Sequence, residues 1–229
     1  MTPALSGLSS MATRDLLGEL AASYHRAHGV AVNIESVGGV DAARRVASGE
    51  AVDVVVLAAD AIERLAAAGH LRADSRTDLA RSGVAIAVRA GAPRPDVSTP
   101  DALREAVLRA RTLGLSTGPS GDALRALFDR WGLGDTLRAR VIQAPPGVPV
   151  GALLAHGEVE LGFQQRSELI GLDGIDLIGP MPPGLEIVTV FAAACATTSS
   201  RPDAVRALLA YLRSPAAAEA VTRHGMTPV

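Results

Sequence analysis

Two short hydroxyl-bearing turns, each followed by a predicted helix, are the segments of this sequence best suited to hold an anion. In the first, Ser9, Ser10, Met11 and Thr13 lie just before or within the first turn of a helix predicted over 11–28. Free N–H groups and the positive end of the helix dipole favour an anion there, and hydroxyl groups add donors. The simpler alternative is that Ser9 or Ser10 only caps the helix. We predict anion contact at this turn.

The second turn spans residues 116–121 and reads Ser-Thr-Gly-Pro-Ser-Gly directly before another predicted helix. Its candidate ligand-binding residues are Ser116, Thr117, Ser120 and Gly121, which offer hydroxyl groups and backbone amides at a helix start. The segment lacks the Gly-Lys-Ser/Thr ending of a nucleotide-binding P-loop, so that site is excluded. Together the two turns predict a clamp that holds one anion.

Two further groups of residues offer neutral donors. Gly38, Gly39 and Val40 precede a helix predicted over 41–48, and the amides of this turn could face a ligand. Gln164 and Gln165 end a predicted strand, where side-chain amides can bind a carboxylate or an oxyanion without adding charge. Helix and strand capping are the structural alternatives for these two groups.

A polycarboxylate ligand would also require fixed positive charge. Arg81 follows a helix-like segment and leads into a predicted strand, which makes it the best-placed arginine for a bidentate carboxylate contact. A surface ion pair is the alternative. No residue is identified as a catalytic base, although Glu35, Asp41 and Glu168 are conceivable.

The elements that must position these residues alternate between strands and helices. Apolar runs at 30–37 and 52–58 predict strands, and helical spacing predicts helices over 41–48 and 61–68. After a strand in 83–91 and a Pro-rich stretch the alternation restarts, with a helix over 100–111. This order predicts parallel sheets flanked by helices, in which ligands gather at the carboxyl ends of strands.

Composition excludes several functional classes. The 229 residues are 48% hydrophobic and carry a net charge of −2, so neither a nucleic acid nor an anionic membrane surface is an expected partner. The sequence contains no lysine, which removes Schiff-base and pyridoxal-phosphate chemistry. Cys195 is the only cysteine and the histidines show no metal-ligand spacing, so we expect no disulfide, no metal and no cofactor.

Four segments carry a resemblance to a known family. They are SSMATRDLLGELAASYHRAHGVAV, SVGGVDAARRVASGEAVDVVVLAADAIERL, SGVAIAVRAG and the terminal RPDAVRALLAYLRSPAAAEAVTRHGM, of which the last is the most specific. In order and spacing they resemble the type II periplasmic-binding-protein superfamily, in particular the molybdate-binding-protein-like branch of ABC-transporter solute-binding proteins. A strand usually precedes the serine-bearing turn in that family, whereas here only MTPALSG does.

The resemblance implies an α/β fold of two Rossmann-like lobes, with mixed, mainly parallel sheets joined by a two-segment hinge and a ligand cleft between the lobes. We expect residues 1–83 and 193–229 in lobe 1 and residues 84–192 in lobe 2. The expected function is binding of a small anion, first of all an organic di- or tricarboxylate, as a solute-binding-protein-like domain.

Two alternatives for the function stay open. The same broad group includes aconitate isomerases, which look like solute-binding proteins but move a double bond in a tricarboxylate by 1,3-proton transfer. The second alternative is molybdate or another tetrahedral oxyanion bound for ABC transport. The molybdate site of the resembling family uses neutral donors alone, and the arginine near the crossover therefore favours a carboxylate.

The expected location depends on a signal peptide. The N-terminal residues show no positively charged segment followed by an apolar one, and no apolar run approaches the length of a membrane span. We expect a cytoplasmic protein without membrane insertion as the sequence stands, and a periplasmic one if a signal peptide has been removed. An ABC permease is an expected partner only in the second case.

Overall fold

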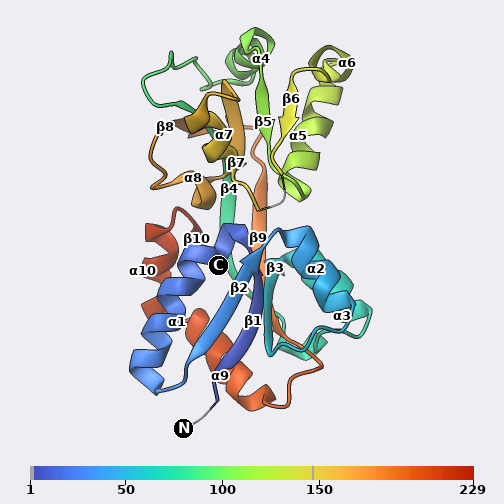
Figure 1. Cartoon of the computed structure of the whole chain (residues 1–229), viewed down its shortest axis with the longest axis vertical. Coiled ribbons are helices and arrows are strands. Elements are labelled where there is room, and N and C mark those ends of the chain that lie inside the picture. The colour runs from blue at the N-terminus through green and yellow to red at the C-terminus, as the bar shows by residue number, and fades with distance from the viewer. Residues whose placement is uncertain (1–2, 146) are drawn as a thin grey trace. The chain divides into compact units, whose positions relative to one another are not determined.

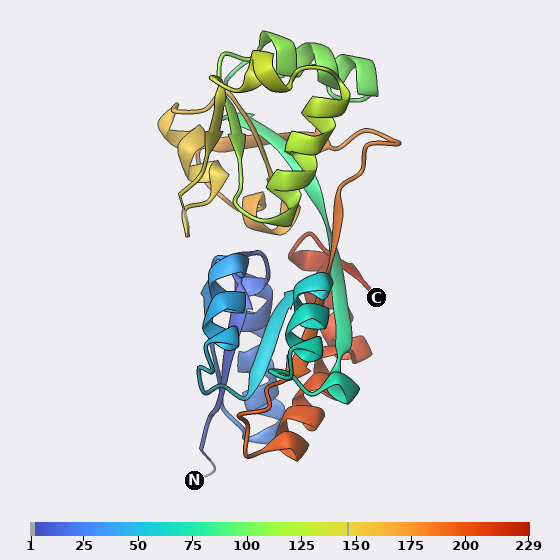
Figure 2. The ribbon, with the colours of Figure 1, turned by 90° about the vertical axis from the view of Figure 1, so that its right-hand side faces the viewer.

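The computed structural model describes residues 3–145 and 147–229 and divides into two compact units. Unit 1 consists of Met1–Ser82 and Thr189–Val229, and unit 2 consists of Gly83–Val188. The chain passes between the units twice, within strand β4 (Thr77–Arg89) and at the start of strand β9 (Val188–Cys195) (Figure 2).

Unit 1 is built on a mixed sheet. Strand β1 (Leu5–Ser10) lies between β2 (Val32–Val37) and β3 (Val54–Ala58), and both neighbours run parallel to it. Strand β9 pairs with β3 in the antiparallel direction, and the short β10 (Thr227–Pro228) pairs with the first half of β4.

Helices cover both faces of the unit 1 sheet, and alternating side chains of the strands explain why (Figure 1). Val54 and Val56 of β3 point to one face of the sheet, which three helices cover. Val55 and Leu57 point to the other face, which two helices cover. The first three helices are α1 (Arg14–His28), α9 (Pro202–Leu212) and α10 (Pro215–Arg223), and the other two are α2 (Gly39–Ala47) and α3 (Ala59–Ala67). A short 3₁₀ turn at Met11–Thr13 joins β1 to α1, and another at Ala73–Ser75 precedes β4. A strand buried on both faces, predicted from the apolar run 52–58, is confirmed.

Unit 2 repeats this plan with shorter strands. Its strands besides β4 are β5 (Leu113–Leu115), β6 (Val141–Gln143), β7 (Leu161–Gln165) and β8 (Ile175–Pro180). β5 is parallel to both β6 and β7, whereas β4 pairs antiparallel with β7 and β8.

The helices of unit 2 also lie on two faces of its sheet. Val84, Ile86 and Val88 of β4 pack into one apolar cluster with α4 (Pro100–Arg109), α5 (Pro119–Arg130) and α6 (Gly134–Leu137). Ala85 and Ala87 point to the opposite cluster, with α7 (Val150–His156) and α8 (Arg166–Leu169). Helix α4 begins with Pro100 after Thr99, whose hydroxyl accepts a hydrogen bond from the Ala102 N–H at 3.1 Å.

The prediction that a helix is the first element was wrong. Residues 5–10 form strand β1, although the sequence LSGLSS contains too few apolar residues to indicate a buried strand. The strand is stabilised by its neighbours, because Leu5 and Leu8 are fully buried and the Ser9 hydroxyl shares a 2.7 Å hydrogen bond with the Ser36 hydroxyl on β2. The family feature of a strand before the serine-bearing turn is therefore present.

A second correction concerns the surroundings of Arg81. The segment before it, interpreted as helix-like, belongs to strand β4, which begins at Thr77 rather than near residue 83. Leu79 and Ala80 are buried there in the cluster with α1, α9 and α10, and such burial depends on contacts distant in sequence. Strands β8 and β10 and the short helices α6 and α8 were also not predicted.

Within residues 3–145 and 147–229, none of the helices combines the length and apolar character that a membrane span requires.

Candidate functional site

The carboxyl ends of the parallel strands of unit 1 bring two predicted site segments together. Because Ser10 of β1 is in register with Val37 of β2, the chain leaves both strands at the same edge of the sheet. A Cβ atom on Gly39 would lie 3.6 Å from the Ser10 Cβ atom. Ser10 and the glycine turn at 38–39 are therefore neighbours, as a shared anion site requires.

The hydroxyl group of Ser10 is the most unusual polar group of this edge. The residue is 7% exposed, and its Oγ atom is buried without a hydrogen-bond partner in the described part of the chain. A buried hydroxyl group left unbonded costs on the order of 1–3 kcal/mol. Such a group is expected where a ligand supplies the missing partner.

The first turn of α2 supplies free amide donors next to this hydroxyl. The helix begins at Gly39, two residues earlier than predicted, so that Val40 lies within its first turn. The Ala42 N–H donates to the Gly38 carbonyl at 2.9 Å, and the amides before it have no partner within the helix. No side chain caps this helix. The Val40 side chain is 62% exposed.

The other residues of the first predicted turn have structural partners. Ser9 is fully buried and bonded to Ser36, and the Thr13 hydroxyl donates to the Ser10 carbonyl at 3.1 Å. Met11 is half-buried in the 3₁₀ turn. Ser10 occupies the N-cap position of the 3₁₀ turn, but its side chain forms no capping hydrogen bond there, and Ser9 lies within β1.

In unit 2 the predicted turn follows the carboxyl end of β5. The Ser116 and Ser120 hydroxyls lie 3.0 Å apart and share a hydrogen bond, and Ser120 is 6% exposed. A Cβ atom on Gly121 would lie only 2.1 Å from the Ser116 carbonyl oxygen, so the turn can close only around a glycine. Thr117 is exposed. Since Pro119 occupies the first position of α5, the amides of Ser120 and Gly121 are donors at this helix start.

The two glutamines end strand β7, parallel to β5 and at the same edge of the unit 2 sheet. The Gln164 Oε1 atom accepts a hydrogen bond from the Val150 N–H, and its Nε2 atom donates to Glu168, both at 2.7 Å. Gln164 thus connects the starts of α7 and α8. Gln165 is buried and occupies the N-cap position of α8.

Arg81 lies on β4 in unit 1, where its backbone pairs with Thr227 of β10. Its side chain is exposed and forms no ion pair with any residue that the structure describes. The surface ion pair that was the alternative for Arg81 is therefore absent there, and ligand contact stays a prediction.

The conceivable bases differ in their surroundings. Glu35 is exposed, and hydrogen bonds from Arg45, whose Nη1 atom lies 2.7 Å away, lower the pKa of its carboxyl group. Asp41 belongs to the first turn of α2 and forms an ion pair with Arg44 at 3.2 Å. Glu168 is half-buried in the first turn of α8. Only Asp41 and Glu168 thus accompany a helix start at the carboxyl edge of a sheet.

A third helix start in unit 1 was predicted as a helix but not as part of the site. Strand β3 is parallel to β1 and ends at Ala58, the N-cap position of α3. No side chain caps α3, so its first amides are free of helix partners, as in α2. Alanine at this position provides no polar signal in the sequence. In the described part of the chain, no three histidine, cysteine, aspartate or glutamate side chains gather to hold a metal.

Comparison with solved structures identifies the class of protein that this fold defines. The periplasmic molybdate-binding protein of Azotobacter vinelandii superimposes with a TM-score of 0.82 at 20% identity, covering 97% of this chain and 98% of that one. The sulfate-binding protein of Mycobacterium tuberculosis H37Rv gives a TM-score of 0.80 at 19% identity, covering 100% and 88%. The fold is that of the type II periplasmic binding proteins.

Sequence comparison identifies the family. Residues 5–227 match the family model described as bacterial extracellular solute-binding protein, and the chain belongs to this family. An aconitate isomerase from a Pseudomonas species is 40% identical over 231 residues, covering 98% of this chain and 88% of the relative. The resemblance stated from the four sequence segments is confirmed.

Proposed function

We propose that the chain binds a small organic polycarboxylate, with aconitate as the first ligand to test. The observation that carries the proposal is the buried, unbonded Ser10 hydroxyl next to the uncapped start of α2. A carboxylate oxygen there would accept hydrogen bonds from Ser10 and from the α2 amides, and the helix dipole would favour its charge. Membership of the solute-binding family supports the binding of a small ligand in general.

We further propose that the Ser116–Gly121 turn of unit 2 contacts the same ligand, with residues 1–83 and 193–229 acting as one lobe and residues 84–192 as the other. The turn presents two hydroxyl groups, which share a hydrogen bond, and two helix-start amides, the same kinds of donor as in unit 1. A tricarboxylate would offer a separate anionic group to each set of donors. Arg81, which forms no ion pair within the described residues, would supply a charged contact.

The second candidate function is isomerisation of that ligand, and it is favoured by the 40% identical aconitate isomerase. A base would remove a proton from the methylene carbon next to the double bond, the electron pair would shift over the three-carbon unit, and a proton would return at the former vinylic carbon. The donors of the two turns would stabilise the negative charge that develops on the carboxylate oxygens. Asp41 and Glu168 are the candidate bases.

Oxyanion transport is the remaining alternative, supported by solved structures that share only the fold. A thermal-shift and calorimetric panel of molybdate, sulfate, cis-aconitate, trans-aconitate and citrate distinguishes these possibilities. We expect the tricarboxylates to raise the melting temperature and the two inorganic anions to leave it unchanged. Stabilisation by molybdate or sulfate alone would contradict the carboxylate proposal.

Proton NMR of cis- or trans-aconitate in deuterated buffer separates binding from conversion. Isomerisation predicts the other isomer together with solvent deuterium in the product, and Asp41→Asn and Glu168→Gln each test one candidate base. Binding without conversion or exchange would leave a solute-binding function, for which an ABC permease is the proposed partner. Fractionation of cells that express the full reading frame tests whether the protein is exported, as the family description suggests.

A further inference from the structure

A cavity of about 560 Å³ lies within unit 2, away from its hydroxyl-bearing turn. It is lined by Arg111 just before β5, by Leu161 at the start of β7 and by Val88 at the end of the antiparallel β4. Arg111 and Leu161 mark the amino ends of β5 and β7. Ser116 follows β5 and Gln165 ends β7, so both lie at the carboxyl ends of these strands. The cavity therefore belongs to the opposite edge of the sheet and is not part of the site proposed above.

The cavity exists because small and rigid residues line it. Ala102, Ala106 and Ala110 recur every fourth residue along α4 and its end, so this row of the helix surface carries no side chain beyond Cβ. Pro93 and Pro95 hold the facing loop. The apolar lining and the volume fall in the range of small-molecule sites.

The charges at the rim are unevenly compensated. Glu160 accepts a hydrogen bond from the Arg111 N–H at 2.6 Å and forms an ion pair with the Arg111 guanidinium. Arg109 contacts Glu105 at 3.6 Å. Arg89 forms no ion pair with any residue between 3 and 145 or 147 and 229, and its Nη1 atom would lie 3.3 Å from a Cβ atom on Gly157. Arg89 is thus the uncompensated cation of the rim.

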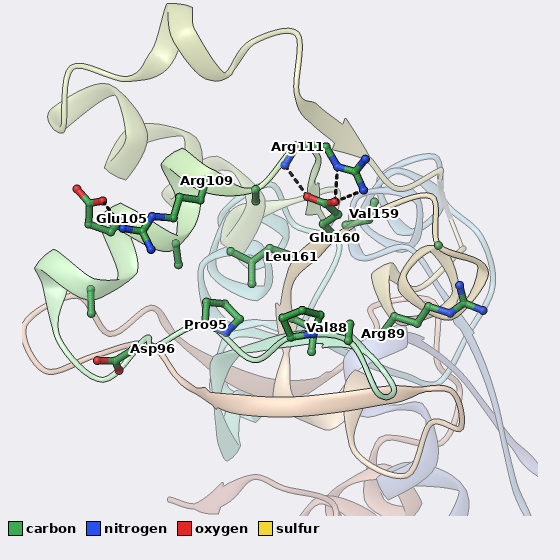
Figure 3. Close-up of a pocket in the computed structure, with 16 residues that line it drawn as sticks. Val88, Arg89, Pro95, Asp96, Glu105, Arg109, Arg111, Val159, Glu160 and Leu161 are labelled. Carbon is green, nitrogen blue, oxygen red and sulfur yellow. Dashed lines mark hydrogen bonds and ion pairs between the residues drawn. The ribbon is translucent and has the colours of Figure 1, made fainter.

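The uncompensated anion of the rim is Asp96, which accepts a hydrogen bond from the Ser98 N–H at 2.9 Å. Figure 3 shows the Arg89 guanidinium and the Asp96 carboxylate at opposite ends of the cavity, with apolar side chains such as Pro95, Val88 and Leu161 between them. The cavity therefore offers a positive end, an apolar middle and a negative end.

We propose that this cavity binds a small amphipathic monocarboxylate, with its apolar body against Val88, Leu161 and Ala106 and its carboxylate on the Arg89 guanidinium. Arginine holds carboxylates through paired N–H donors, and the apolar lining removes the hydrocarbon body from water. A dicarboxylate of the same length would place its second charge near Asp96 and bind more weakly. The polycarboxylates proposed for the hydroxyl-bearing turns are therefore poor ligands here.

Octanoate, octanedioate and octan-1-ol form a matched set of probes, and two-dimensional amide NMR of the full chain locates them. We expect octanoate to bind with a Kd of about 1 mM or tighter and to shift the amides of Val88, Gly157 and Leu161. Octanedioate and octan-1-ol should each bind at least about tenfold more weakly, because one adds a repelled charge and the other lacks the charge that Arg89 contacts.

Substitutions at two lining residues test the cavity, and a third variant outside it serves as the control. Arg89→Gln should weaken octanoate at least about tenfold, while Arg130→Gln, an exposed arginine of α5 that does not line the cavity, should leave it unchanged. Ala106→Leu should fill the cavity and abolish binding. If the leucine variant fails to fold, Arg89→Gln carries the test alone.

Three results would overturn the proposal. The first is that octanoate does not bind. The second is that octanoate binds the wild type and the Arg89→Gln variant equally. The third is that octanoate shifts only the amides of the Ser10 and Ser116–Gly121 turns. Aconitate binding is measured in parallel, and its presence or absence tests the function proposed for those turns without bearing on this cavity.

Discussion

Replacing Ser10 by alanine is the sharpest test of the proposed anion site, because the two effects expected from it have opposite signs. The Ser10 Oγ atom is buried and has no hydrogen-bond partner in the described chain, so the folded protein bears the desolvation cost of this hydroxyl without a compensating bond. Removing it should raise the free energy of unfolding of the ligand-free protein by about 1 kcal/mol. The same change should weaken anion binding by about 1–3 kcal/mol, the cost of losing a charge-assisted bond.

Chemical denaturation of the ligand-free protein measures the first effect, and isothermal titration with the anion identified by thermal shift measures the second. Ser9→Ala is the matched control, since the Ser9 hydroxyl already shares a hydrogen bond with Ser36. We expect Ser9→Ala to lower the free energy of unfolding by about 1 kcal/mol. A Ser10→Ala protein that is less stable and binds the anion with unchanged affinity would refute the reasoning, because that result describes a serine with only a structural role.

Three further predictions concern stability and reactivity. Gly121→Ala should lower the free energy of unfolding by about 1–3 kcal/mol, because its Cβ atom would meet the Ser116 carbonyl oxygen; unchanged urea denaturation would contradict this. Burial alone would raise the pKa of Asp53, but hydrogen bonds from Ser199, the Ser6 N–H and Arg201 outweigh burial and lower this pKa. The ionised Asp53 carboxylate therefore stabilises the fold above the unfolded pKa of about 3.9, and this stabilisation is lost as the pH falls through the lower folded-state pKa. The acid-induced loss of stability should be smaller in Asp53→Asn, and equal pH profiles would argue against it. Burial raises the pKa of the Cys195 thiol, so iodoacetamide should label it slowly in the folded protein and rapidly in urea, as mass spectrometry can measure.

The strand and helix pattern was largely predictable because it depends on local sequence. The apolar run at 52–58 indicated a strand buried on both faces, and β3 is one. Strand β1 was missed because LSGLSS has few apolar residues, and its stability comes from parallel pairing with β2 and β3. Strand pairing joins residues that are distant in sequence, so it cannot be predicted from the local spacing of apolar residues.

The candidate site was predictable in its residue types and less so in the role of each residue. Hydroxyl groups and glycines before helices indicated anion donors at both turns, and the structure brings Ser10 beside the glycine turn at 38–39. The sequence could not separate Ser10 from Ser9, because their difference lies in partners: Ser9 contacts Ser36 on β2, whereas the Ser10 hydroxyl has none within the described chain. The hydrogen bond between the side chains of Gln164 and Glu168 could not be predicted from the sequence either.

The sequence by itself determined the α/β class, the family and the chemistry of the two turns, because helix starts, glycine turns and apolar runs are encoded by neighbouring residues. Only the tertiary structure decided that the Ser9 hydroxyl is bonded, while the Ser10 hydroxyl has no partner among the described residues. It also decided that Arg81 lies on a strand, and that the row of alanines on α4 borders a cavity at the amino-end edge of the unit 2 sheet. These features arise from contacts between segments distant along the chain, and such contacts exist only once the sheets have formed.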